Sequence, residues 1–181
     1  MKHPELLSTD IFYKSFENFN QSIISDINEF KKNDIITAYA YNTNSGNLKD
    51  FNEDTITAQK IKLNNFENFY FFGVFDGHGG NGCSDFLKNN LHKNIKEFSI
   101  SGIKNGIDTT EKDFLNNYAV NSNGDLLDYS GSCACFALIN NKKLIIANIG
   151  DSRIIIMKNK KIFFTTKDHK PNNIMKKKNR E

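Results

Sequence analysis

The chain has 181 residues, 38% of them hydrophobic, which is enough for one domain with its own core. Its formal net charge of +3 is too small to indicate a nucleic-acid-binding protein. No apolar run approaches the roughly 18 residues of a membrane span, and the first residues lack a basic-then-apolar leader. The three cysteines are an odd set without a disulfide framework. We therefore expect a cytoplasmic or nuclear protein with neither a nucleic-acid nor a membrane partner.

The first third of the chain is predicted to form one helix and three strands. In residues 15–33 apolar side chains recur every three or four positions, which predicts an amphipathic helix; it lies in an N-terminal extension, residues 1–33. Residues 35–41 are β-branched and aromatic, residues 55–63 alternate in polarity, and residues 69–75 form an apolar run, so each predicts a strand. Their short connections imply an antiparallel meander.

The middle of the chain is predicted to be mainly helical. Residues 81–98 carry an apolar stripe at helical spacing, which predicts a second helix. Residues 99–108 contain Gly102 and Gly106 and are predicted to form a loop. Residues 109–120 predict a third helix, which a threonine would cap.

The last part of the chain is predicted to form a second antiparallel meander, from which the fold class follows. Strands followed by helices and then by strands indicate an α+β domain rather than a parallel-sheet fold. We expect two packed antiparallel β-sheets flanked by helices, in a domain that covers residues 34–171. The basic residues 172–181 would be a tail or the start of an insertion. The predicted strands of the second meander are residues 133–140, 143–148, 153–158 and 161–165.

The segment 71–80 combines a buried-strand pattern with a polar, glycine-rich end. It opens with an apolar, aromatic run and closes with Asp76, His78 and three glycines. An unpaired carboxylate is costly at the mouth of a core strand, and glycine lets the backbone approach a ligand closely. These features favour a metal or phosphate site. The alternative is a tight strand-to-helix turn with a solvated aspartate and histidine.

Further acids are predicted to lie near Asp76. If the strands at 55–63 and 69–75 pair antiparallel, Glu53 and Asp54 converge with Asp76 at one sheet end. Three carboxylates held together repel unless cations lie between them, and hard ions such as Mg²⁺ or Mn²⁺ suit oxygen ligands. Asp151, at a later strand junction, is another candidate ligand or support; the alternative is a turn with a local Asp–Arg pair.

Cysteine chemistry is not favoured by the spacing. A cysteine-based phosphatase needs an arginine six residues after its nucleophile, and none of the three cysteines has one. Cys133 and Cys135 lack a second pair with which to form a zinc site.

Five short segments, taken together, resemble the signature motifs of the metal-dependent Ser/Thr protein phosphatases of type 2C, the PPM family. They occur in the family's order across about residues 35–171, which makes the resemblance highly specific. Cys133 departs from it, because the family has threonine there. The five segments are NED at 52–54, FDGHGG at 75–80, SGSCA at 130–134, NIGDSR at 148–153 and DHKP at 168–171.

The resemblance implies a role for each matched residue. Asp76 would bridge two Mg²⁺ or Mn²⁺ ions, the Gly77 carbonyl would bind one, and Glu53 would bind through water. Asp54 would support these ligands, and His78 would protonate the leaving serine or threonine oxygen. A metal-activated water would then attack phosphorus in phosphoserine or phosphothreonine of a phosphoprotein.

Two departures from the family suggest a rival hypothesis. Lys49 stands where the family usually has an arginine that clamps the substrate phosphate, and lysine lacks the bidentate fork. The family's later half supplies two more metal-binding aspartates, whereas no aspartate follows Pro171 here. We therefore expect the N-terminal part of a phosphatase domain, incomplete on its C-terminal side, whose missing half would be supplied in cis or in trans. The rival is a catalytically inactive, phosphatase-like binding or regulatory protein.

Overall fold

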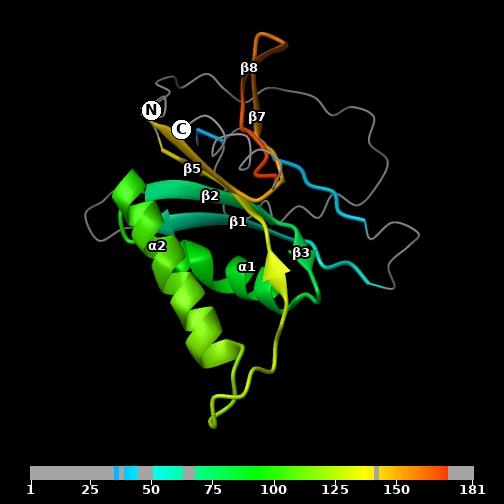
Figure 1. Cartoon of the computed structure of the whole chain (residues 1–181). Coiled ribbons are helices and arrows are strands. Elements are labelled where there is room, and N and C mark those ends of the chain that lie inside the picture. The colour runs from blue at the N-terminus through cyan, green and yellow to red at the C-terminus, as the bar shows by residue number, and fades with distance from the viewer. Residues whose placement is uncertain (1–34, 37–38, 45–50, 63–67, 141–142, 171–181) are drawn as a thin grey trace, which may run out of the picture.

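The computed structural model of the chain describes residues 35–36, 39–44, 51–62, 68–140 and 143–170. These residues form antiparallel sheets, and the helices α1 and α2 pack against one face of the largest sheet (Figure 1). The arrangement confirms the predicted α+β class with antiparallel sheets and helices. The elements are β1 (Thr55–Lys62), β2 (Asn68–Phe75), β3 (Gly77–His78), α1 (Gly82–Asn94), α2 (Ile100–Asp113), the π-helical turn η2 (Phe114–Tyr118), β4 (Gly131–Ser132), β5 (Ala134–Ile139), β6 (Leu144–Ile149), β7 (Ile155–Lys158) and β8 (Lys161–Thr165).

The main sheet has four strands in the order β1-β2-β5-β6, and every neighbouring pair is antiparallel. Strands from the first and the last part of the chain therefore share this sheet, because β5 pairs with β2. A second, short ladder joins β3 to β4 just beyond the end of β2.

The core lies between the main sheet and the two helices. Alternate residues of β2 point into it, and Phe69, Phe71 and Phe75 are each fully buried. Leu91 of α1 and Ile103 of α2 pack against them. Burying each such side chain is worth about 1.5–3 kcal/mol, so this layer accounts for much of the stability of the described fold.

The helix after α1 begins earlier than predicted, so the predicted loop at 99–108 is wrong. Ser99 caps α2, since its Oγ accepts a hydrogen bond from the Gly102 amide at 2.9 Å. Gly102 and Gly106 are buried where α2 crosses the preceding turn, and a Cβ on Gly106 would lie 2.7 Å from Cγ1 of Ile95. The glycines therefore allow close packing rather than breaking the helix.

The strand predicted at 35–41 is absent from the residues of that stretch that the structure describes. Ile36 is nevertheless buried, in a small cluster with Tyr70 and Ile139. Its apolar, β-branched character thus reflects burial against the sheet and not membership of a hydrogen-bonded ladder.

The hairpin β7–β8 stands apart from the main sheet (Figure 1). Its turn is at Asn159 and Lys160, as predicted, and both residues have positive φ, 52° and 62°. Positive φ at both central residues is the mark of a type I′ turn, whose twist matches that of the flanking strands.

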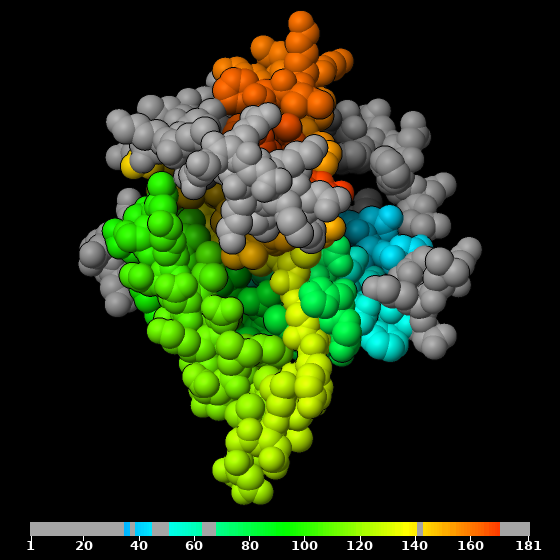
Figure 2. Space-filling view, viewed as in Figure 1, coloured from blue at the N-terminus to red at the C-terminus, as the bar shows by residue number. Residues whose placement is uncertain are grey.

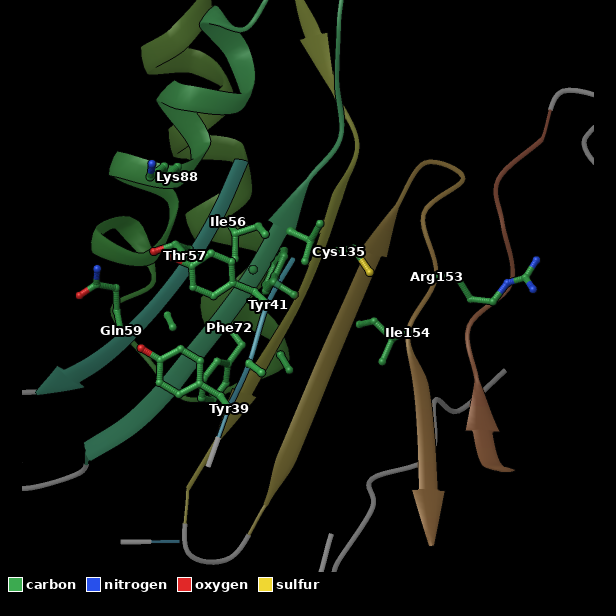
Figure 3. Close-up of a pocket in the computed structure, with 16 residues that line it drawn as sticks. Tyr39, Tyr41, Ile56, Thr57, Gln59, Phe72, Lys88, Cys135, Arg153 and Ile154 are labelled. Atoms are coloured by element: carbon green, nitrogen blue, oxygen red, sulfur yellow. The ribbon is translucent and has the colours of Figure 1, made fainter. Parts of the chain in front are cut away.

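The sheet face opposite the helices, called here the outer face, carries a pocket of about 560 Å³. Tyr39, Tyr41, Phe72, Cys135 and Ile154 are among the residues that line it (Figure 3). The pocket is therefore mainly a hollow between an extended segment and an apolar sheet face. Within the described ranges, neither helix is long and apolar enough to cross a membrane.

Three of the expectations concern residues that the structure does not describe. These are the helix at 15–33, the basic segment 172–181 and the phosphate-binding role of Lys49. They remain predictions.

Candidate functional site

Four of the five motif segments meet at one end of the main sheet. Thr55 pairs with Phe75, so β1 begins where β2 ends, and the predicted antiparallel pairing of these strands is confirmed. Ala134 pairs with Ile149, so β5 begins and β6 ends at the same edge. The residues just beyond these four strand ends therefore lie around one place.

Glu53 is held by contacts on two sides and is only 8% exposed. Its Oε1 accepts a hydrogen bond from the Gly80 amide at 2.7 Å, and its carbonyl accepts one from Ser84 Oγ at 2.6 Å. A Cβ on Gly77 would collide with that same carbonyl oxygen. Glu53 thus joins the glycine-rich segment to the first turn of α1.

Asp76 and Asp54 flank the paired ends of β2 and β1. Asp76 is exposed, and its carbonyl accepts hydrogen bonds from the Cys133 amide at 2.8 Å and from Ser132 Oγ at 3.2 Å. Asp54 is half-buried, and its amide donates to Asn52 Oδ1 at 3.0 Å in an Asx turn. The backbone of both residues is therefore fixed at the sheet end.

His78 is exposed and lies on β3, paired with Gly131 of β4. Its ring lies so close to Gly131 that a Cβ there would be 2.5 Å from Cε1 and 2.7 Å from Nε2. The absence of a side chain at Gly131 therefore makes room for the imidazole.

Asp151 is brought to the same end by β6. The Cys133 thiol donates a weak hydrogen bond to Asp151 Oδ1 at 3.4 Å, and the Cys133 amide donates to the Asp76 carbonyl, so Cys133 links the two aspartates. The alternative of a local Asp–Arg pair is not what the structure shows, because Arg153 forms two hydrogen bonds with Asp168, at 2.9 and 2.8 Å.

The fifth motif contacts the fourth through backbone and side chains. The Gly150 amide donates to His169 Nδ1 at 3.3 Å, and the His169 amide donates to the Gly150 carbonyl at 2.9 Å. The hydrogen-bonded Arg153 guanidinium holds the pKa of Asp168 below its ordinary value. Together these contacts form a clasp, defined here as Gly150, Arg153, Asp168 and His169.

The candidate ligand side chains of the site are carboxylates. Hard divalent cations prefer such oxygen ligands. Among the residues that the structure describes, however, no three His, Cys, Asp or Glu side chains are grouped so that they could hold a metal ion. A divalent cation at this place would therefore need further ligands besides the described carboxylates.

Two of the three thiols are poorly suited to nucleophilic chemistry. Burial raises the pKa of Cys135 to about 11. Burial, with smaller contributions from Asp128 and Glu111, raises the pKa of Cys83 to about 11. At neutral pH both are protonated, and a thiol attacks phosphorus only as the thiolate. This agrees with the spacing of the residues around the cysteines, which argues against a cysteine-based phosphatase.

Sequence reasoning missed the residues that support the site. Ser84, which is fully buried, is 31 positions from the Glu53 carbonyl that it contacts. Ser130 Oγ accepts a hydrogen bond from the Cys83 amide at 2.8 Å, which fastens the segment before β4 to α1. For Ser84, the only signal in the sequence was a polar residue in the first turn of the predicted helix at 81–98.

A family model described as Protein phosphatase 2C matches residues 37–177. Protein phosphatase 1B of Homo sapiens is 32% identical over 139 residues, a match that covers 67% of this chain and 29% of the relative. Probable protein phosphatase 2C 11 of Arabidopsis thaliana is 41% identical over 103 residues, covering 56% of this chain and 28% of the relative. The chain thus spans less than a third of the length of these two relatives.

The fold also matches a solved structure. The serine/threonine phosphatase Stp1 from Staphylococcus aureus superposes with a TM-score of 0.55 at 24% identity, covering 76% of this chain and 56% of that one. The family model covers most of the sequence, and the motifs it contains meet at one sheet end. The chain belongs to the protein phosphatase 2C family.

Proposed function

We propose that this chain is part of a protein serine/threonine phosphatase that hydrolyses phosphoserine and phosphothreonine in phosphoproteins with the help of Mg²⁺ or Mn²⁺. The observation that carries the proposal is the convergence of Glu53, Asp54, Asp76 and His78 at one sheet end in a member of this family. The free cysteines favour a reducing location, the cytoplasm or the nucleus.

Each residue of the site has a role in this proposal. Asp76 and the Gly77 carbonyl would hold the metal directly, Glu53 would do so through water, and Asp54 would support them. Asp151, which Cys133 contacts, would be an additional ligand or support. When bound, the two ions expected in the complete domain would lower the pKa of a water molecule and so supply the nucleophile.

His78 would act on the leaving group. Its imidazole is exposed and lies beyond the end of β2, two residues from Asp76. A protonated ring nitrogen there could donate its proton to the serine or threonine oxygen as the bond to phosphorus breaks. Lys49, outside the described residues, would contact the substrate phosphate.

The other ligands would come from the rest of the domain, either on the same polypeptide or on another chain. This part of the proposal is supported by the extent of the matches, since the chain spans about half of the solved phosphatase and less of the curated relatives. The alternative is a non-catalytic, phosphatase-like binding protein, which the small number of grouped ligands in the described residues favours.

Two substitutions test the proposal in an active phosphatase domain that contains this chain. Asp76→Asn should remove nearly all Mn²⁺-dependent hydrolysis of p-nitrophenyl phosphate, because the charged carboxylate that would hold the metal is lost. Asp108→Asn, on the exposed side of α2, is the matched control and should leave the rate unchanged. Equal rates in the two variants would exclude Asp76 from the reaction.

His78→Ala separates proton donation from the rest of the mechanism. It should slow hydrolysis of a phosphopeptide by about 10²-fold or more, and that of p-nitrophenyl phosphate much less, because p-nitrophenolate leaves without a proton. Equal losses on both substrates would rule out the general-acid role. If the wild-type domain hydrolyses neither substrate but binds phosphopeptides, the non-catalytic alternative holds.

A further inference from the structure

The loop between η2 and β4, residues 119–129, is well ordered by its own hydrogen bonds. The Leu127 amide donates to the Ala119 carbonyl at 2.7 Å, and Val120 forms a bridge with Leu126. Asn121 Oδ1 accepts hydrogen bonds from two amides farther along the loop, both at 2.9 Å. The loop therefore has a defined shape without a covering element.

This ordered loop displays apolar side chains to solvent. Leu126 is 43% exposed, Leu127 66% and Tyr129 78%, and Tyr129 is the most exposed of the large hydrophobic residues that the structure describes. We call these three residues the apolar strip. Three exposed apolar side chains within four residues of an ordered loop indicate a contact surface, since burying them would be favourable.

The apolar strip is continuous with the candidate site. The Tyr129 carbonyl and the Ser130 Cα lie against Gly79, where an added Cβ would be 3.6 and 3.8 Å from them. Tyr129 is also two residues before Gly131, the pairing partner of His78. In Figure 2 the yellow-green segment that leads into β4 runs alongside the green β3 segment.

We propose that the apolar strip binds an apolar side chain of the phosphopeptide substrate, close to the phosphoserine or phosphothreonine. Tyr129 is two residues before Gly131, the pairing partner of His78, and two residues of chain span at most about 7 Å. A peptide side chain bound at Tyr129 would therefore be about two positions from a phosphorylated residue held beside His78. A tyrosine offers large contact area at a small cost in side-chain entropy. The inference rests on the phosphopeptide recognition in the proposed function.

Other occupants fit the loop less well. A stable protein interface buries about 800 Å² on each partner, more than three side chains can supply. An anionic membrane surface attracts basic residues, whereas the charged residues between Tyr118 and Tyr129 are Asp125 and Asp128. A short peptide anchored by its phosphate at the neighbouring site needs only this small area.

A titration followed by NMR tests the inference without any turnover. A phosphatase domain that contains this chain, with Mg²⁺, is titrated with two phosphothreonine peptides in which a phosphonate replaces the phosphate. They differ only in having Leu or Gln two positions on either side of the phosphorylated residue. We expect the Leu peptide to bind about tenfold more tightly, as partial burial of one aliphatic side chain implies, and to shift the Leu127 and Tyr129 signals.

Variants assign the preference to the strip. Tyr129→Ala and Leu127→Ala should each reduce the preference for the Leu peptide severalfold, and Tyr129→Phe should keep it. Ile162→Ala is the matched control, because Ile162 is also 66% exposed but lies on β8, at the opposite end of the molecule (Figure 1). It should keep the full preference. The three side chains that these four variants change are exposed, so the variants should fold like the wild type.

The inference is overturned if the wild type binds the two peptides equally or binds neither, or if Tyr129→Ala retains the preference. Equal binding of an unphosphorylated Leu peptide would also overturn it, since the strip would then be a contact surface for another protein. A chain that prefers the Leu peptide but never yields an active phosphatase would keep the inference and refute the enzymatic function.

Discussion

The imidazole of His78 lies over the Cα of Gly131, across the short ladder that joins β3 to β4. The two residues are 53 positions apart in the sequence, and each belongs to a different motif of the family. Since an added Cβ would fall within 2.5 Å of the ring, the glycine determines where the imidazole can lie.

Gly131→Ala is therefore expected to displace the ring of His78 while leaving the fold intact. The new methyl group would meet the far end of an exposed side chain, which can rotate away at little cost. Activity of the phosphatase domain on a phosphopeptide should fall at least tenfold, with a smaller loss on p-nitrophenyl phosphate, because the proton donor has moved. Thermal unfolding should be nearly unchanged, and a large drop in the midpoint would show that the glycine serves the fold instead.

The position of Asp54 and Asp76 beyond neighbouring strand ends was predictable from the sequence because it depends only on the strand pairing. The alternation of 55–63, the apolar run of 69–75 and the short connection between them predict the antiparallel pair that the structure shows, in which Thr55 pairs with Phe75. The supporting contacts were not predictable in this way. The bond from Ser84 to Glu53 joins a helix to a strand entrance, and hydrophobic periodicity carries no information about such pairs.

The errors in the secondary structure have the same origin. Gly102 and Gly106 indicated a loop by propensity, yet close packing of α2 on Ile95 requires small residues there, and tertiary packing overrides propensity. For Arg153, the nearby Asp151 was the obvious ion-pair partner in the sequence. Asp168 instead meets both nitrogens of the guanidinium fork, which is the stronger geometry.

Ser84→Ala is expected to weaken both the fold and the site. It leaves a buried carbonyl of Glu53 without its hydroxyl donor, which costs about 1–2 kcal/mol of unfolding free energy. It should also reduce activity, because Glu53 loses one of the contacts that hold it. Urea denaturation and Mn²⁺-dependent hydrolysis, both at a temperature where the protein is folded, measure the two effects.

The matched control for this substitution is Ser99→Ala. Ser99 caps α2, so its loss should also cost about 1 kcal/mol, but α2 begins away from the site and activity should persist. If both serine variants lose activity to the same degree, the loss reflects stability alone and the positioning role of Ser84 is wrong.

The clasp should hold the Asp151 turn in a pH-dependent way. Arg153→Lys keeps the charge but loses the bidentate fork, so the amides of Gly150 and His169 should exchange with solvent faster than in the wild type. Hydrogen exchange read by NMR or mass spectrometry measures this. Unchanged exchange at both amides would mean that the backbone contacts suffice without the ion pair.

The sign of the pH dependence follows from the lowered pKa of Asp168. Because its pKa is lower in the folded state, the stabilisation is complete above the ordinary value of 3.8 and is lost as pH falls through the folded value. The wild type should therefore lose its advantage in melting temperature over Asp168→Asn as the pH is lowered from 7 to 3. An advantage that grows on acidification would contradict the assignment.

The exposed apolar side chains of the hairpin β7–β8 indicate how the isolated 181-residue chain associates in solution. Among its strand residues only Ile156 is buried, while Ile155, Met157, Ile162 and Phe163 are each more than half exposed. It is paired with no other described strand, and the outer face beside it contains the pocket lined by Tyr39 and Phe72. Open strand edges and exposed apolar faces promote association.

We therefore expect the 181-residue chain by itself to self-associate, to unfold with marginal stability and to show no phosphatase activity above background. Sedimentation velocity at several concentrations should reveal the association, and Met157→Lys with Ile162→Lys should reduce it, because charges on both strands oppose edge pairing. Leu115→Lys, about half exposed on η2 and away from the hairpin, is the control and should leave association unchanged. A cooperative, active monomer at every concentration would show that this chain completes the core and the site without further strands.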